Sequence, residues 1–211
     1  MSKKNNINED NIFTPTIITV GNSNVGKTSI IRKFCFNIFD SNTLSTIGLA
    51  FSYKEIVIKN KIKIRIKLID TGGQEKYRAM TKSYFKNADG VLFTYSKDNQ
   101  ESFDEIKHWI ELFNENNNRE DIVKYLVETK DDLERVVDED ISREFAKKYN
   151  FGFKKTSSKK DENSVNELFQ EMGEMLFENH LKYNKENLGQ TGMKLTKPKK
   201  RKKVCCLFTP E

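Results

Sequence analysis

A glycine-containing segment between a β-branched run and a helical pattern has the strongest chemical signal in this sequence. Residues 21–28 read GNSNVGKT and fit the pattern G-x-x-x-x-G-K-S/T. Its glycines let the backbone wrap a phosphate chain, and N–H groups at a helix start favour negative charge. Lys27 is expected to reach the β- and γ-phosphates, and the Thr28 hydroxyl to ligate Mg²⁺. The candidate nucleotide contacts here are Gly21, Asn22, Ser23, Asn24, Val25, Gly26, Lys27, Thr28 and Ser29.

A second phosphate signal follows at residues 68–75, which read LIDTGGQE. Asp70 ends an apolar run, and its carboxylate can support Mg²⁺, an ion that combines few carboxylates with phosphates and waters. Gly73 can offer an N–H to a γ-phosphate with no side chain in the way. Gln74 can orient a water for in-line attack. A glycine-containing turn of chance spacing is the alternative for either segment, but two phosphate signals in this order favour a nucleotide site.

Alternating strand and helix patterns place these segments. Apolar or alternating runs predict strands at residues 14–20, 51–58, 62–69, 90–95, 122–127 and 151–155. Helical spacing of apolar residues predicts helices at 27–36, 103–113, 139–149 and 164–177. The second and third strands, three residues apart, predict a hairpin with one solvated face. Strands alternating with helices imply parallel βαβ units, so the expected fold class is a doubly wound α/β sheet.

Length and charge indicate one domain with a basic tail. We expect a flexible arm at residues 1–11, a folded domain at 12–177 and a tail at 178–211. The tail holds nine Lys or Arg and three Glu, whereas the rest of the chain has 28 of each sign, so the tail carries the whole net charge of +6. A basic tail on a neutral body favours an address or an anchor over nucleic-acid binding.

The composition argues against a membrane-spanning, a secreted and a disulfide-rich protein. The sequence has no run of 18 apolar residues, so no transmembrane helix is predicted. The first residues also lack the apolar stretch of a signal peptide. Three cysteines give no disulfide framework, which favours a reducing, cytosolic compartment.

Taken together, the chain resembles the Ras superfamily of small GTPases, and its Rab branch in particular. The resemblance covers about residues 14–177 and implies a P-loop NTPase small G domain. Such a domain has a mostly parallel six-stranded sheet with one antiparallel strand and helices on both faces. The motifs that carry it, in family order, are GNSNVGKT (21–28), STIG (45–48), DTGGQEKYR (70–78), TKDD (129–132) and TSSK (156–159).

The resemblance implies roles at the phosphate end of the site. Thr46 is the switch residue that approaches Mg²⁺ and the γ-phosphate of bound GTP, and Gly73 senses that phosphate. Gln74 positions the hydrolytic water and is the catalytic residue. The implied magnesium ligands are Thr28, Thr46 and Asp70.

At the base end, the resemblance implies that Phe39 stacks on guanine and that the Lys130 stem covers the other face. Asp132 would accept two hydrogen bonds from guanine, which adenine cannot donate, and the Ser158 N–H would reach the base oxygen. On residue type alone, Phe39 is instead a core aromatic, and Lys130 with Asp132 a solvated charge cluster. The remaining implied contacts are Thr129, Ser157 and Lys159.

Four residues depart from the Rab pattern. Thr129 replaces the usual Asn, as in Rho-type members, and Gly72 replaces Ala, which loosens the loop before Gln74. Ile69 stands where Rabs carry a partner-facing Trp, and Ser96 where they carry Asp.

The tail suggests a membrane anchor. Residues 197–204 read KPKKRKKV and precede Cys205 and Cys206, where two lipid chains would suffice for stable anchoring. Five residues follow the cysteines and no C-a-a-X ending is present, so prenylation and palmitoylation both remain open. We expect a peripheral protein of the cytosol and of the cytoplasmic face of an intracellular or plasma membrane, with a nuclear address as the alternative.

The predicted function is a monomeric GTP/GDP switch that hydrolyses GTP slowly and recruits effectors in vesicle or membrane traffic. Its expected partners are guanine nucleotide, effectors, exchange factors, GTPase-activating proteins and a membrane, but no nucleic acid. A nucleotide-binding pseudo-GTPase and a nuclear-transport-type GTPase are the alternatives. An ATP-dependent P-loop kinase is disfavoured by Asp132 and Ser158.

Overall fold

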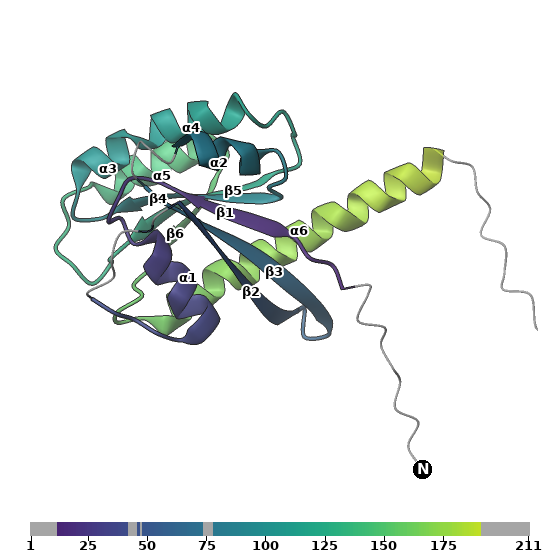
Figure 1. The fold of residues 1–211 in the computed structure, drawn as a ribbon, viewed down its shortest axis with the longest axis horizontal. Helices are drawn as coiled ribbons and strands as arrows, with labels where there is room; N and C mark the ends of the chain where they lie inside the picture. The colour runs from purple at the N-terminus through teal and green to yellow at the C-terminus, as the bar shows by residue number, and fades with distance from the viewer. Residues whose placement is uncertain (1–11, 42–45, 47, 74–77, 191–211) are drawn as a thin grey trace, which may run out of the picture.

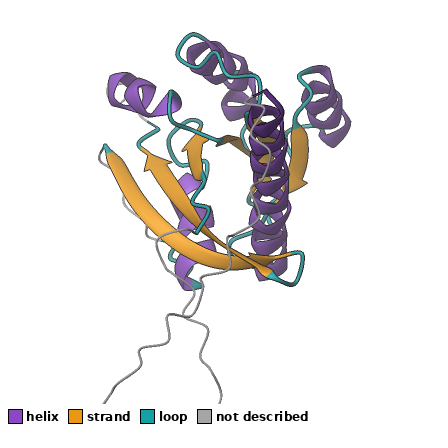
Figure 2. Ribbon diagram, turned by 90° about the vertical axis from the view of Figure 1, so that its right-hand side faces the viewer, coloured by secondary structure: helices purple, strands orange, loops and turns teal. Residues whose placement is uncertain are grey.

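The computed structural model describes residues 12–41, 46, 48–73 and 78–190. Within these residues the chain forms one six-stranded sheet with helices on both faces (Figures 1 and 2). The strands are β1 (Thr16–Val20), β2 (Leu49–Ile58), β3 (Ile62–Thr71), β4 (Gly90–Ser96), β5 (Val123–Thr129) and β6 (Gly152–Lys155). The helices are α1 (Lys27–Phe36), α2 (Arg78–Phe85), α3 (Gln100–Asp104), α4 (Ile106–Asn114), α5 (Glu139–Lys148) and α6 (Glu162–Gln190).

The sheet confirms the expected fold class. Its strand order is β2-β3-β1-β4-β5-β6, and only the β2–β3 pair is antiparallel among the described strands. Parallel neighbours require crossover connections. The chain supplies them with helix α1 between β1 and β3, helices α3 and α4 between β4 and β5, and helix α5 between β5 and β6. The carboxyl ends of β1, β3, β4 and β5 therefore meet at one edge, where open α/β sheets place their ligands.

Alternation along β3 explains why the β2–β3 hairpin has one solvated face. Ile64, Ile66 and Leu68 are fully buried, whereas Lys63 and Arg65, at alternate positions, pair with Glu55 on the outer face. A period of two residues sends successive side chains to opposite faces of a strand. The predicted hairpin is confirmed.

Two apolar layers sandwich the sheet. On one face, α1 and α6 pack Phe34 and Phe169 in a stacked pair, with ring centroids 4.0 Å apart. On the other, α2 to α5 pack a cluster centred on Phe113 of α4, whose ring contacts those of Phe85 and Phe93. This packing fixes the strand ends that carry the loops of the site.

Several predicted element bounds were wrong. The helix expected at 103–113 is two helices, α3 and α4, which are separated at Glu105. Helix α3 starts earlier than expected because Asn99 caps it by accepting a hydrogen bond from Ser102 N–H. Helix α2 was not predicted. Helix α6 continues to Gln190, so residues 178–190, which were expected to begin the tail, are helical.

The part of α6 that follows residue 177 contacts the rest of the domain through its first turn. His180 stacks on Phe13 with ring centroids 4.3 Å apart, and Asn179 Nδ2 donates to the Asp121 carbonyl at 3.0 Å. The last turns project past the sheet (Figure 1). Polar helix formers continue a helix even where the apolar stripe ends, which is why fading periodicity did not mark its end. The arm at 1–11 and the tail from 191 lie outside the described residues. No helix in the described part of the chain is long and apolar enough to cross a bilayer.

Candidate functional site

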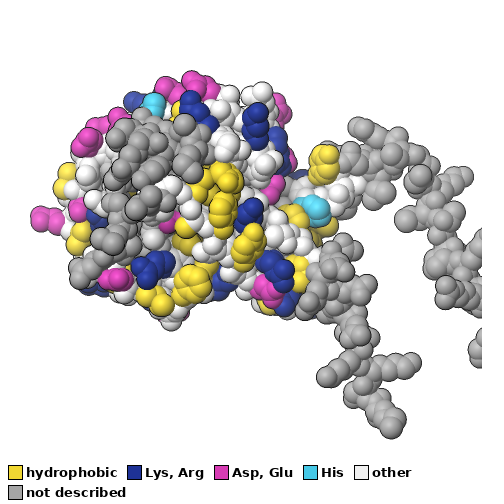
Figure 3. All heavy atoms as spheres, in the orientation of Figure 1, with side chains coloured by type: hydrophobic (Ala, Val, Ile, Leu, Met, Phe, Trp, Pro, Cys, Tyr) yellow, Lys and Arg dark blue, Asp and Glu magenta, His cyan; other side chains and the backbone are white. Residues whose placement is uncertain are grey.

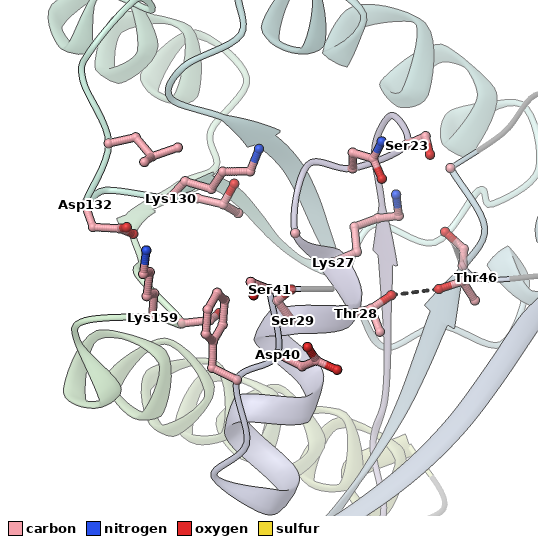
Figure 4. A pocket seen from close by; sticks show the side chains of 18 residues that line it. Ser23, Lys27, Thr28, Ser29, Asp40, Ser41, Thr46, Lys130, Asp132 and Lys159 are labelled. Carbon is pink, nitrogen blue, oxygen red and sulfur yellow. Dashed lines mark hydrogen bonds between the residues drawn. The ribbon is translucent and has the colours of Figure 1, made fainter. Parts of the chain in front are cut away.

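A cavity of about 380 Å³ opens at the carboxyl edge of the sheet. Figure 4 shows Lys27, Thr28 and Thr46 on one side of it and Lys130, Asp132 and Lys159 on the other. The cavity thus joins segments that lie far apart in the sequence. Its lining residues are Ser23, Asn24, Gly26, Lys27, Thr28, Ser29, Phe39, Asp40, Ser41, Thr46, Thr71, Gly73, Thr129, Lys130, Asp132, Leu133, Ser158 and Lys159.

The glycine-containing loop after β1 shapes one end of the cavity. Gly26 has φ 96°, in the region that favours glycine, and α1 begins at the next residue. Lys27 is 5% exposed, and its Nζ donates to the carbonyls of Gly21 at 2.9 Å and Asn22 at 2.6 Å. Burial lowers the pKa of Lys27 to about 8, and the nearby Asp70 carboxylate acts in the opposite direction. A phosphate here would stabilise the ammonium form further.

Three oxygen-bearing side chains converge beside this loop. The Thr28 and Thr46 hydroxyl oxygens lie 2.7 Å apart, as the dashed line in Figure 4 marks. Thr28 Oγ1 is also 2.7 Å, and Thr46 Oγ1 3.2 Å, from Asp70 Oδ2. Burial raises the pKa of Asp70, and hydrogen bonds from the two hydroxyls together with Lys27 partly offset that rise.

This cluster fits a magnesium ion. Asp70 Oδ1 is buried without a hydrogen-bond partner among the described residues, so the carboxylate keeps an acceptor available. Two hydroxyls and one carboxylate form a hard oxygen donor set, which Mg²⁺ completes with phosphates and water. No group of three or more His, Cys, Asp and Glu side chains that could hold a metal gathers anywhere in the described ranges.

Gly73 lies against the same loop. A Cβ at this position would be 2.4 Å from the Asn22 carbonyl carbon, 2.5 Å from the Asn22 oxygen and 2.5 Å from Lys27 Nζ. Only glycine permits this approach of the segment after β3. Gln74, the predicted catalytic residue, follows directly but lies outside the described residues.

The opposite end of the cavity collects the predicted base contacts. Phe39, Lys130, Asp132, Ser158 and Lys159 all line it. Asp132 Oδ1 accepts a hydrogen bond from Ser157 Oγ at 2.6 Å, which fixes the carboxylate from behind. Phe39 is 38% exposed, so the interpretation as a core aromatic is wrong for this residue.

Five predicted site residues do not line the cavity but support it. The carbonyls of Gly21 and Asn22 hold Lys27, the Asp70 carboxylate contacts two hydroxyls, and Ser157 holds Asp132. Val25 offers its carbonyl to Thr129. Lining residues that sequence reasoning missed are Asp40, Ser41, Thr71 and Leu133, each of which adjoins a predicted motif or contact.

Thr129, one of the departures from the Rab pattern, lies at the centre of the edge. Its hydroxyl oxygen is 2.5 Å from the Val25 carbonyl and 2.9 Å from the Tyr95 carbonyl. The side chain therefore bridges the loop after β1 to the end of β4. A threonine hydroxyl can thus tie these segments together in place of an amide.

Trp109 is a contact that the sequence did not reveal. Its ring is fully buried in α4, and Nε1 donates to Asn22 Oδ1 at 3.0 Å. The partners lie 87 positions apart, so no local spacing could have indicated the bond. Trp109 therefore couples a core helix to the glycine-containing loop.

Comparison with known proteins identifies the family. A model of the Ras family matches residues 16–178. The chain is 38% identical to the Ras-related protein Rab-11B of Dictyostelium discoideum over 168 residues, 77% of this chain and 76% of that protein. It is 35% identical to the Ras-related protein SEC4 of Saccharomyces cerevisiae over 77% of this chain and 74% of that protein. It is 38% identical to the GTP-binding protein ypt3 of Schizosaccharomyces pombe over 72% of this chain and 71% of that protein.

Ras family proteins bind guanine nucleotide with Mg²⁺ and hydrolyse GTP, and the donor set and cavity described above suit both ligands. The chain belongs to the Ras family of small GTPases and is related within it to the Rab proteins.

Proposed function

We propose that this protein is a Rab-like switch that binds GTP or GDP, hydrolyses GTP slowly alone and recruits effectors in membrane traffic. One observation carries the proposal. Thr46 and Gly73, from two separate segments, meet Thr28 and Lys27 at the same end of the cavity. Contacts to a terminal phosphate at this point would order both segments, and hydrolysis would release them.

The phosphate end has the groups that this chemistry requires. Lys27 supplies a buried ammonium, and the first residues of α1 line the cavity, where the N–H groups of a helix start favour negative charge. Thr28, Thr46 and Asp70 would hold the metal, which supplies positive charge that neutralises the phosphates. Gln74 is proposed to orient the attacking water.

Guanine recognition is assigned to Asp132. Its carboxylate would accept hydrogen bonds from the guanine N1–H and exocyclic amine, and Ser157 holds it in place. Adenine offers no such donor pair and would leave the carboxylate unsatisfied. Phe39 and Lys130 would cover the two faces of the base, and the Ser158 N–H would reach its carbonyl oxygen. Thr129 and Lys159 are the remaining proposed contacts at this end.

Hydrolysis is proposed to be slow without a partner. No arginine lines the cavity within the described ranges, and an arginine supplied by an activating protein is worth about 10³–10⁵ in rate. Rapid single-turnover hydrolysis by the purified protein alone would contradict this part of the proposal.

An aromatic patch between the switch segments is the proposed effector surface. Phe51 and Tyr53 are 46% and 56% exposed on edge strand β2. The Tyr84 and Phe51 ring centroids lie 5.5 Å apart, and Lys67 Nζ, on the neighbouring strand β3, is 5.3 Å from the Phe51 centroid. Figure 3 shows hydrophobic and basic side chains side by side over this hairpin. Ile69 is 1% exposed and adds nothing to the patch, so effectors that depend on the usual Trp are expected to bind poorly.

Membrane attachment through Cys205 and Cys206 remains a proposal, because both lie outside the described residues. The basic run before them would add about 1 kcal/mol per residue near an anionic leaflet. Detergent phase partitioning of cell-expressed protein, with both cysteines changed to Ser as control, tests it. Wild-type protein that stays in the aqueous phase would refute the anchor.

Nucleotide identification tests the proposed site most simply. Protein purified quickly from cells is denatured and the released nucleotide is separated and identified, and GDP is expected. Lys27→Ala is expected to carry none. Bound ATP, or Lys27→Ala loaded like the wild type, would overturn the assignment, and GDP binding without turnover would instead support a pseudo-GTPase.

A further inference from the structure

A fully buried carboxylate lies directly behind the base end of the cavity. Glu128 is 0% exposed and immediately precedes Thr129 at the end of β5. A buried charge is unfavourable unless it is paired and hydrogen-bonded. Its carboxylate contacts the Tyr95 hydroxyl, which is also 2.8 Å from Ser142 Oγ of α5, so Glu128 lies on the sheet face that α5 covers and needs a partner from that side.

Arg135 supplies this partner through two parallel hydrogen bonds. Its Nη1 lies 2.9 Å from Glu128 Oε2, and its Nη2 lies 2.7 Å from Oε1. Tyr95 Oη donates to Oε2 at 2.7 Å, and burial raises the pKa of Tyr95 so that the phenol stays protonated. A bidentate pair fixes direction as well as distance, which a single contact does not.

Arg135 stands near the end of the loop that carries the base motif. Two further bonds of its guanidinium reach the Val137 carbonyl at 2.9 Å and the Glu139 carboxylate at 3.2 Å. Glu128 precedes this loop and Arg135 closes it. The pair therefore clamps the segment from residue 130 to 134 at both ends.

The clamped segment needs external support. Lys130 has φ 54°, a left-handed conformation that L residues keep only when their surroundings hold it. Asp131 N–H donates to the Thr156 carbonyl at 3.1 Å, and Lys97 Nζ donates to the Asp131 carbonyl at 2.9 Å. Asp132 follows directly, so a shift of this backbone would move its carboxylate.

We propose that the Glu128–Arg135 pair positions Asp132 for recognition of the exocyclic amine of guanine. The inference rests on the proposed guanine site and deepens it. Glu128 and Arg135 are positioning residues, because neither lines the cavity. Losing the clamp frees the loop and weakens the discrimination between guanine and hypoxanthine, which lacks that amine, while the phosphate contacts persist.

The test compares the affinities of GDP and inosine diphosphate by competition against a fluorescent nucleotide. In the wild type GDP is expected to bind more tightly. Arg135→Ala is expected to lower the ratio of the two affinities about tenfold, the effect of about one hydrogen bond to a charged group. Arg143→Ala is the matched control, because Arg143 bonds to Glu139 but not to Glu128, and it should leave the ratio unchanged.

A double variant separates positioning from the cost of an unpaired charge. Glu128→Gln with Arg135→Met removes both charges of the pair, and this variant is expected to fold like the wild type yet show the same loss of discrimination. Discrimination equal to the wild type in the double variant overturns the proposal, as does an equal fall of both affinities in Arg135→Ala. Wild-type protein that binds neither nucleotide would contradict the proposed function itself, and with it this inference.

Discussion

A single methyl group at Gly73 should separate the two nucleotide states. The Cβ of Gly73→Ala would be 2.4 Å from the Asn22 carbonyl carbon and 2.5 Å from Lys27 Nζ. Because backbone atoms cannot yield as a flexible side chain can, the segment must retreat by about 1 Å to reach van der Waals contact. Overpacking of this kind is unfavourable by about 1–3 kcal/mol, which corresponds to about 5- to 150-fold in an equilibrium constant.

The expected result is a selective loss of affinity for GTP. A non-hydrolysable GTP analogue should bind Gly73→Ala about 5- to 150-fold more weakly than it binds the wild type, because in the proposed mechanism only a nucleotide with a γ-phosphate gains affinity from the close approach of this segment. GDP affinity should stay within about threefold. Both affinities are measured by competition against a fluorescent nucleotide.

The matched control is Gly173→Ala in α6, where a Cβ would meet only side-chain atoms, the nearest at 3.0 Å. This variant should leave both affinities unchanged. Equal loss of GDP and GTP-analogue affinity in Gly73→Ala, or no loss of either, would refute the reasoning.

Three further predictions follow from the site. Gln74→Leu should keep GDP and GTP affinity but slow single-turnover hydrolysis at least about tenfold, since apolar Leu cannot orient water; unchanged hydrolysis would remove Gln74 from catalysis. Thr129→Val deletes a hydroxyl that contacts two backbone carbonyls at the edge of the sheet, and should lower the free energy of unfolding by about 1–3 kcal/mol in a denaturant titration and speed GDP release. Wild-type stability and GDP release in this variant would mean that the bridge is inert. The emission of Trp109, the one tryptophan of the chain, should change when nucleotide is removed, because its indole donates to Asn22 in the nucleotide loop; identical spectra with and without GDP would argue against this coupling.

Local pattern predicted most of the fold and the residues at the phosphate end of the site. The alternation of Ile64, Ile66 and Leu68 with basic residues identified β3, because a strand exposes every second side chain. Most phosphate-end residues were predicted from two short motifs, each of which lies within one loop, whereas the base-end residues were predicted only from the resemblance to the Ras superfamily. The cavity brings most of these residues together.

Contacts between residues far apart in the chain could not be predicted from the sequence pattern. Thr129 meets the Val25 carbonyl across 104 positions, and the Trp109 bond to Asn22 spans 87. The burial of Glu128 was not predicted either. Its partner Arg135 lies only seven positions away, but it lies in an irregular loop, where no regular spacing indicates the pair. Helix α6 continued past residue 177 because helix formers propagate without an apolar stripe, once Asn179 and His180 anchor the next turn.

The central claim is that the terminal phosphate of GTP determines how the segments of Thr46 and Gly73 are arranged. Hydrogen–deuterium exchange of the peptides that contain these two residues tests it most directly, with the protein loaded with GDP or with a non-hydrolysable GTP analogue. The account predicts slower exchange in both peptides with the analogue, and no such difference in peptides from the core of β4 and β5. Exchange that is the same in both nucleotide states would contradict it.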